Sequence, residues 1–212
     1  MEALDQITAT LAVTMGLAWA SGINLYATLL TLGFLANSGN IDLPPDLQIV
    51  ANPLVMGAAG IMYFIEFFVD KTPGVDTGWD TIHTFIRIPA GAMLAAGAVG
   101  DLNPAVEIAA ALLGGSLAAG THATKAGTRV LINTSPEPFS NWIASIGEDV
   151  AVVAGVWASI NHPVFFLIAL VLFVILMIWL LPMIWVGVKK VFRLILGWFR
   201  KEESPTNLNL PQ

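Results

Sequence analysis

The sequence predicts an all-α integral membrane protein with six transmembrane helices. Hydrophobic residues make up 56% of the 212-residue chain and charged residues only 11%, a balance unlike that of soluble domains. The mean hydropathy is +0.76. The apolar stretches are long enough to cross about 30 Å of hydrocarbon, and none shows the alternating pattern that is typical of a membrane β-barrel.

The apolar segments are separated by short connections rich in glycine, proline, asparagine and aspartate. The predicted spans are residues 7–35, 53–69, 81–99, 104–132, 142–160 and 164–188. All nine lysines and arginines can be placed on one side of the membrane, since the connections 36–52, 100–103 and 161–163 contain none. The positive-inside rule therefore predicts a multi-pass protein of the inner (plasma) membrane with both termini cytoplasmic.

Residues 1–188 are expected to form a single transmembrane domain. The N-terminal segment lacks the basic region of a signal peptide, so we expect it to be retained. Residues 189–203 alternate between basic and apolar types, which predicts a cytoplasmic amphipathic helix along the membrane interface or a stop-transfer anchor. Residues 204–212 are predicted to be a disordered tail.

Several classes of function have no support in the sequence. The chain has no cysteine, which excludes disulfides and thiolate metal sites. No basic patch favours nucleic-acid binding, and no hydrolase, metalloprotease or phosphate-loop motif is present. We therefore expect no enzymatic activity, no metal and no cofactor. The expected partners are membrane lipids, a small ion or solute, and further copies of the chain in a homo-oligomer.

Two segments of the chain resemble each other in their pattern of small residues. The aligned pairs are Ala12 with Ala110, Gly16 with Gly114, Ala20 with Ala118, Gly22 with Gly120, and Asn24 with His122. Three spans in each half would make residues 5–100 and 103–188 two inverted three-helix repeats, with helices 1 and 4 broken at their glycines. The alternative is that these small residues only let helices pack closely.

Ionisable residues inside the predicted spans each cost at least about 2.5–3.5 kcal/mol at mid-bilayer unless they are paired or hydrated. They occur in four groups: Glu66 and Asp70, His83 and Arg87, His122 with Lys125 and Arg129, and Glu148 beside Asp149. One hypothesis is that they form structural ion pairs. The other is a water-filled cavity whose carboxylates bind a cation or proton, or whose bases bind an anionic head group. Glu66 is the first candidate because aromatic residues surround it.

Polar groups near the predicted helix breaks complete the candidate site. Half-helix ends there would offer backbone groups to a permeant species; the residues concerned are Ser21, Gly22, Asn24, Gly120, Thr121 and His122. The two interior histidines, His83 and His122, are either proton relays or ordinary buried histidines, since they lack the spacing of metal ligands. Asp80 is placed to cap the span that begins at residue 81.

The polar strings of the chain resemble those of an uncharacterised group of small bacterial and plant membrane proteins, domain of unknown function family 4126. The strings that carry the resemblance are "ASGINLYAT", "DKTPGVDTGWDTIHTFIRIPAGA", "GTHATKAGTR" and "NTSPEPFSNWIASIGEDV". The resemblance covers about residues 10–160. It implies a membrane architecture and no established substrate.

These observations lead to one principal functional hypothesis and two alternatives. The first is a transporter or channel for a small solute or ion, with the pathway at the interface of the two repeats and the intramembrane charges at the binding site. The second is a protein that handles lipid or polyprenyl-phosphate head groups through its basic residues. The third is a membrane scaffold that transports nothing.

Overall fold

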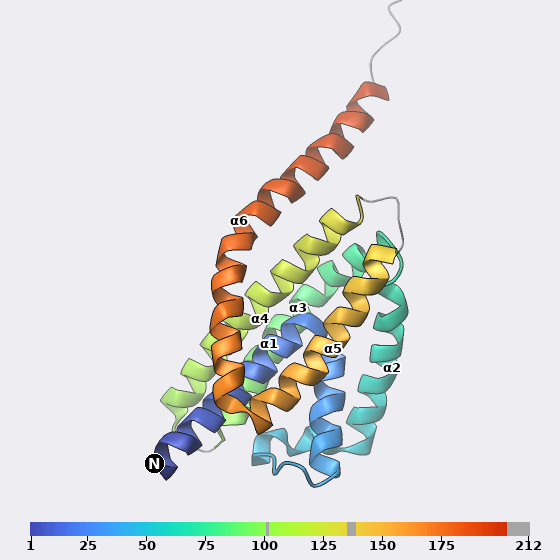
Figure 1. The fold of residues 1–212 in the computed structure, drawn as a ribbon. Coiled ribbons are helices and arrows are strands. Elements are labelled where there is room, and N and C mark those ends of the chain that lie inside the picture. Colours follow the sequence, from blue (N-terminus) through green and yellow to red (C-terminus); the bar gives the residue numbers. More distant parts are fainter. Residues whose placement is uncertain (101, 135–138, 203–212) are drawn as a thin grey trace, which may run out of the picture.

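The computed structural model describes residues 1–100, 102–134 and 139–202, and within them all regular structure is helical (Figure 1). The elements are α1 (Glu2–Asn37), the 3-10 helix η1 (Pro45–Ala51), α2 (Pro53–Val69), α3 (Val75–Val99), α4 (Pro104–Ile132), α5 (Phe139–Asn161) and α6 (Pro163–Glu202). Every predicted span lies within one of the α-helices. The predicted all-α class is therefore confirmed.

Five helices are long and apolar enough to cross a membrane, namely α1, α3, α4, α5 and α6. A sixth span is possible if η1 and α2, which are bent by 62° at their junction, are counted together. The chain is thus a multi-pass membrane protein. Two of its helices begin at an asparagine followed by proline: Asn52 accepts a hydrogen bond from the amide of Leu54 at 2.9 Å, and Asn103 accepts one from Ala105 at 2.8 Å.

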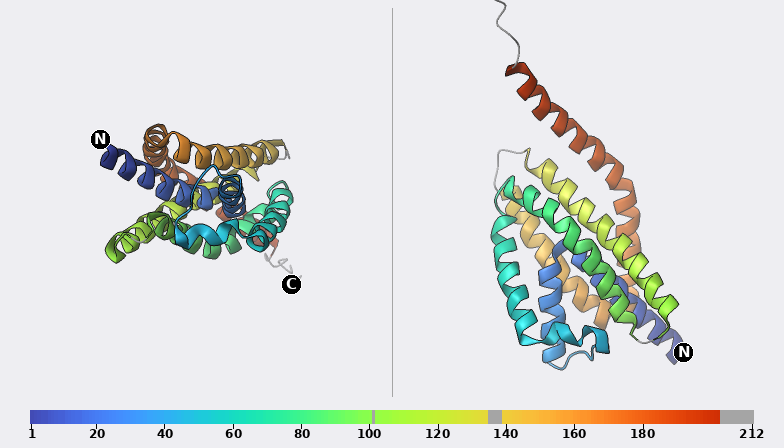
Figure 2. Two further views of the ribbon diagram at one scale, coloured as in Figure 1. Left: turned by 90° about the horizontal axis from the view of Figure 1, so that it is seen from below. Right: turned by 180° about the vertical axis from the view of Figure 1, so that it is seen from behind.

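Helix α1 does not run straight through the bundle. Its backbone leaves the helical region at Asn24, where φ is −146° and ψ is 101°, and its two halves return to the same end of the bundle (Figures 1 and 2). In the first half, Ala12 packs with Phe166 near the start of α6. In the second half, Asn37 donates to the carbonyl of Ala51 in η1 at 2.9 Å. α1 is therefore a re-entrant hairpin whose tip lies inside the bundle.

This course bears on two predictions about topology, the side of the termini and the inverted repeat, and confirms neither. The N-terminus lies at one end of the bundle and the last turns of α6 extend beyond the other end (Figure 1), an arrangement that does not support the prediction that both termini are cytoplasmic. The two halves of the chain are also not equivalent, because α1 turns back whereas α4 is helical from Pro104 to Ile132. Hydropathy did not reveal the difference, since an apolar hairpin and a crossing helix have the same composition.

The predicted helix breaks are only half correct. The break in α1 falls two residues after Gly22, and α4 continues through Gly120 without interruption. A Cβ atom on Gly120 would lie 2.8 Å from the terminal methyl carbon of Met177 in α6. The absence of a side chain at Gly120 thus allows α6 to approach, and α4 keeps the intrahelical hydrogen bonds that a membrane helix needs.

Small residues bring α1, α3 and α4 into close contact. A Cβ atom on Gly22 would lie 2.6 Å from the carbonyl oxygen of Ala118, and one on Gly91 would lie 2.7 Å from the hydroxyl of Ser21. Such distances are too short for any side chain, so these glycines are needed for packing. The pattern of small residues that resembles a repeat therefore serves close helix packing.

Helix α6 continues without a gap from the bundle to Glu202. It contains Pro182 and bends as it leaves the bundle (Figure 1); a proline inside a helix is the usual cause of such a bend. The predicted amphipathic helix at residues 189–203 is, through residue 202, the last part of α6 rather than a separate element. The predicted disordered tail, residues 204–212, lies outside the described residues.

Candidate functional site

The tip of the α1 hairpin is held by side chains of the surrounding helices. Asn24 caps the second half of α1, because its Oδ1 accepts from the amide of Ala27 at 3.0 Å. The carbonyl of Ile23, at the end of the first half, accepts from the Lys125 ammonium at 3.1 Å. A cation is the favourable partner for the negative end of a helix dipole. Polar groups freed by the break are thus bound by protein, as a break at membrane depth requires.

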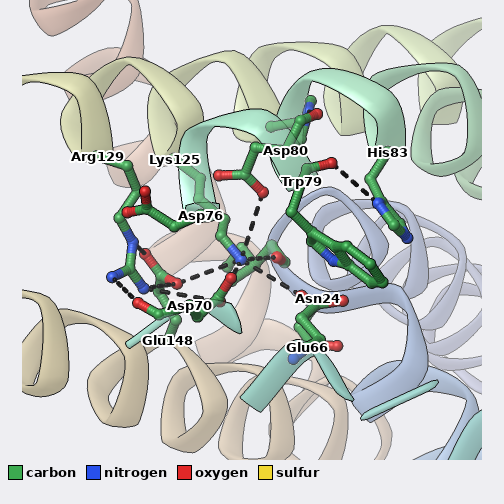
Figure 3. A network of polar contacts seen from close by, with 12 residues as sticks. Asn24, Glu66, Asp70, Asp76, Trp79, Asp80, His83, Lys125, Arg129 and Glu148 are labelled. Carbon is green, nitrogen blue, oxygen red and sulfur yellow. Dashed lines mark hydrogen bonds and ion pairs between the residues drawn. The ribbon is translucent and has the colours of Figure 1, made fainter. Parts of the chain in front are cut away.

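Lys125 is the centre of a group of ionisable side chains around this tip, all of them buried except the partly exposed Glu148 (Figure 3). Its Nζ lies 2.9 Å from Asp70, 3.4 Å from both Glu66 and Glu148, and 3.8 Å from Asp80. Four helices or their ends contribute these residues, so the group joins α2, α3, α4 and α5 around α1. We name it the charge cluster; its members are Glu66, Asp70, Asp80, Arg87, Lys125, Arg129 and Glu148.

Two arginines bind the carboxylates at opposite ends of the charge cluster. Arg87 pairs with Glu66 and, at 3.2 Å, with Asp80. Arg129 binds both oxygens of Glu148, at 2.6 and 3.3 Å, and its remaining donors contact the carbonyls of Asp70 at 3.1 Å and Asn141 at 3.0 Å. Both arginine side chains are fully buried. Two-pronged contacts between an arginine and a carboxylate hold the two side chains in a fixed orientation, in addition to their electrostatic attraction.

The charge cluster contains four carboxylates and only three cations. Three buried oxygens, Oε2 of Glu66, Oδ1 of Asp70 and Oδ2 of Asp80, have no hydrogen-bond partner among the described residues. A buried surplus negative charge is costly unless a further positive charge or a proton neutralises it. Within the described part of the chain, no group of His, Asp and Glu side chains has the arrangement of a metal site.

His122 is a fully hydrogen-bonded histidine in the interior. Its Nδ1 lies 3.2 Å from NH1 of Arg87, which can only donate. Its Nε2 therefore carries the hydrogen and donates to the carbonyl of Asp80 at 3.0 Å. His83 is bonded similarly, to the carbonyl of Trp79 at 2.9 Å and to the hydroxyl of Tyr26 at 3.1 Å. Both rings orient neighbouring groups on α3 in this arrangement.

Asp149 lies beside the charge cluster and is bonded differently. It accepts from the side-chain amide of Asn24 at 3.0 Å and from the hydroxyl of Tyr63 at 3.1 Å. Among the described residues it has no ion pair within 4.0 Å. Asn24 thereby links Asp149 directly to the break in α1. Asp149 also lines an open groove of about 710 Å³ between α1 and α5.

Two titratable groups lie in the connection just after α2, outside the spans. Burial would raise the pKa of the Asp70 carboxyl, but the charges of Lys125 and Arg129 lower the pKa more, so that it lies below its usual value. Burial lowers the pKa of the Lys71 ammonium. Lys71 donates to the carbonyl of Phe67 at 2.9 Å and to the hydroxyl of Ser145 at 3.2 Å.

Six of the fourteen predicted site residues are members of the charge cluster, and His122 contacts one of them, Arg87. Asn24 and Asp149 bond to each other beside it, His83 bonds to Tyr26 and Trp79, and Gly22 packs against Ala118. Three others also contribute no ion pair. Ser21 donates to the carbonyl of Ala18 at 2.9 Å, Gly120 packs against α6, and Thr121 is buried against Gly22 with a hydroxyl that has no partner among the described residues. The charges of Lys125, Arg87 and Arg129 are balanced by carboxylates, as the structural ion-pair hypothesis requires, with one acid in excess.

Asp80 was wrongly predicted to be a helix cap. α3 begins at Val75 rather than at residue 81, so Asp80 lies inside the helix, fully buried and paired with Arg87. The acid that bonds the first amides of α3 is Asp76, whose Oδ1 accepts from Gly74 at 2.9 Å and Thr77 at 2.6 Å. The seven-residue spacing of Asp80 and Arg87 on one helix face was the signal that could have identified this pair.

Tyr26 and Tyr63 are two further residues of the site that sequence reasoning missed. Each places its hydroxyl on a predicted site residue, Tyr26 on His83 and Tyr63 on Asp149. They are the two tyrosines of the chain. A tyrosine in an apolar span carries a hydroxyl that needs a partner when buried, and that rule would have identified both.

Apolar helices packed around a buried charge cluster define this chain as a multi-pass integral membrane protein. Residues 11–183 match the family described as a domain of unknown function (DUF4126). The chain belongs to this family, and the resemblance identified from its polar strings is confirmed. No curated protein and no solved structure matches the chain.

Proposed function

We propose that the protein is a membrane transporter or channel for a small solute or ion, with the charge cluster as its binding site for a proton or monovalent cation. The observation that carries this proposal is the surplus carboxylate at the interior tip of α1. Discontinuous helices that end near mid-membrane are a common feature of transporter binding sites, where half-helix carbonyls bind cations. Here the carbonyl of Ile23 already binds a cation, the ammonium of Lys125.

Lys125 supplies the chemistry of an exchange step in this proposal. Its ammonium occupies the position between Glu66, Asp70 and the end of the first half of α1 that a permeant cation would occupy. A cation that enters the charge cluster competes with this tethered charge. Movement of the Lys125 side chain away from the carboxylates would then open the site, and its return would expel the cation. The pathway follows the break in α1 rather than a symmetric interface between repeats.

The basic end of α6 supports one orientation of the chain in the membrane. Lys189, Lys190 and Arg193 lie on the part of α6 that extends beyond the bundle, and the positive-inside rule places this end in the cytoplasm. The N-terminus and η1 then face the opposite side. The loop between α2 and α3 is at the cytoplasmic end, and so the charge cluster is reached most directly from the cytoplasm.

The head-group alternative has weaker support. Lys125 is 6% exposed and Arg129 is 0% exposed, and carboxylates bind both. An anionic head group would have to displace carboxylates from both bases. The scaffold alternative requires only paired charges, and the surplus carboxylate is the feature that it leaves without a role.

Flux measurements in proteoliposomes test the proposal. The purified chain is reconstituted with a pH-sensitive dye inside and challenged with gradients of protons, Na⁺, K⁺ and organic cations. We expect flux from the native chain, its loss in Glu66→Gln, which removes a charge but keeps the shape, and unchanged flux in Glu107→Gln, an exposed acid at the other end of the bundle. Silence of the native chain with every ion would refute transport and favour the scaffold.

A further inference from the structure

A groove between the second half of α1 and α5 lies beside the charge cluster and is lined by residues that are not members of it. Its walls are apolar, with Leu30 from α1 and Val153 from α5 among them, and its volume is about 710 Å³. This volume lies within the range of pockets that hold drug-sized ligands. Val153 is half exposed, so the groove is open on the surface of the bundle, and the apolar residues of its walls suit contact with lipid.

A single carboxylate lines this apolar groove. Asp149 accepts hydrogen bonds from two neutral donors, Asn24 and Tyr63. It has no ion pair among the described residues, whereas every carboxylate of the charge cluster has at least one. An ionised carboxylate beside hydrocarbon is stabilised when a cation comes into contact with it. The groove therefore favours a positively charged occupant over a neutral or an anionic one.

Aromatic rings surround the same groove. Phe34 of α1, Tyr63 of α2 and Trp157 of α5 all line it. The faces of such rings attract cations, and aromatic cages of this kind recognise quaternary ammonium groups. A metal ion would need several oxygen ligands, but Asp149 is the one acidic side chain that lines the groove. Aromatic and aliphatic walls instead suit a cation that carries an apolar body.

We propose that this groove binds a monovalent organic cation with an apolar body, such as a quaternary ammonium or phosphonium ion, which enters from the bilayer and places its charge beside Asp149. The inference deepens the proposed function, because it names a substrate class for the same protein. Asn24 connects the two sites: its amide donates to Asp149 and its Oδ1 caps α1 at the charge cluster. A cation in the groove would neutralise the Asp149 carboxylate, to which the Asn24 amide donates. Because Asn24 also caps the second half of α1, cation binding is linked to the break in α1.

Equilibrium binding of radiolabelled tetraphenylphosphonium to the purified full chain in detergent tests this inference without requiring flux. We expect saturable binding to the native chain and binding weaker by at least about tenfold in Asp149→Asn, which keeps the shape but removes the charge. Trp157→Leu, which keeps the carboxylate but removes an aromatic wall, should weaken binding several-fold. Glu107→Gln is the matched control for loss of one negative charge and should bind as the native chain does.

The outcomes separate the possible occupants of the groove. Equal binding by the native chain and Asp149→Asn, with both variants folded by circular dichroism, would overturn the proposal. Retention of a phospholipid or a second copy of the chain that the phosphonium ion does not displace would also overturn it. Because binding is measured without a membrane gradient, specific binding with no flux in proteoliposomes would refute transport and leave this site standing. Flux without specific binding would refute this site and leave the transport proposal standing.

Discussion

Replacement of Lys125 by methionine is expected to destabilise the protein strongly. The ammonium lies within 4.0 Å of four carboxylates and holds the carbonyl of Ile23. Methionine has a similar length but no charge, so the variant would leave three buried carboxylates and the partly exposed Glu148 facing two arginines. Removal of one partner from a buried ion pair typically costs about 3–5 kcal/mol, because the remaining charge stays buried.

This loss is large enough to measure in detergent. For a chain of this size, each kcal/mol corresponds to roughly 2–4 °C in melting temperature, so the expected decrease is about 6–20 °C. The matched control is Lys190→Met, since Lys190 is exposed on the last part of α6. Adding Glu66→Gln to Lys125→Met should restore part of the loss, because it removes one of the carboxylates left without a cation. A decrease of less than about 1 kcal/mol for Lys125→Met, or no recovery in the double variant, would show that the charge cluster is hydrated rather than dry.

Three further predictions follow from the same structure. Since the chain has no native cysteine, Glu2→Cys and Lys190→Cys should react with an impermeant maleimide from opposite sides of a sealed vesicle; labelling from one side would contradict the re-entrant course of α1. Gly22→Ala should lose about 1–3 kcal/mol through overpacking when unfolding is followed by circular dichroism, whereas Gly147→Ala should not, because a Cβ atom there meets nothing within 4 Å. Because the pKa of Asp70 is lowered in the folded state, its ionised form stabilises the fold above its unfolded pKa of about 3.9, and this contribution is lost as the pH falls through the folded pKa. The stability difference between the native chain and Asp70→Asn should therefore be constant at pH 5 to 7 and shrink below about pH 4; a difference that grows on acidification would contradict this assignment.

Much of the fold could be predicted from sequence because the signals are local. An asparagine followed by proline and an apolar run is a local signal for the start of a helix, and α2 and α4 start where this signal predicts. The start of α3 was placed six residues too late because its first turns are polar, with Asp76 and Asp80 among them. These acids face the interior, and hydropathy cannot distinguish a buried paired carboxylate from a solvated one.

The candidate site was predicted in its composition but not in its pairing. The sequence identified Glu66, Lys125 and Arg129 as costly interior charges, and they do meet at one place. It could not show that Asp80 would join the charge cluster while Asp149 stays outside it. Such pairing depends on the rotation and depth of four different helices relative to one another, and these quantities are set by side-chain packing across the bundle.

The sequence by itself determined the membrane class, the positions of the apolar helices along the chain, and the membership of the family, because hydropathy and turn chemistry act within a few residues of the chain. Only the tertiary structure decided that α1 turns back inside the bundle. The break at Asn24 is stable because Lys125 binds the freed carbonyl of Ile23 and Asp149 binds the Asn24 amide. Those partners lie more than 100 residues away along the chain, and without them the unpaired backbone groups would be too costly at membrane depth.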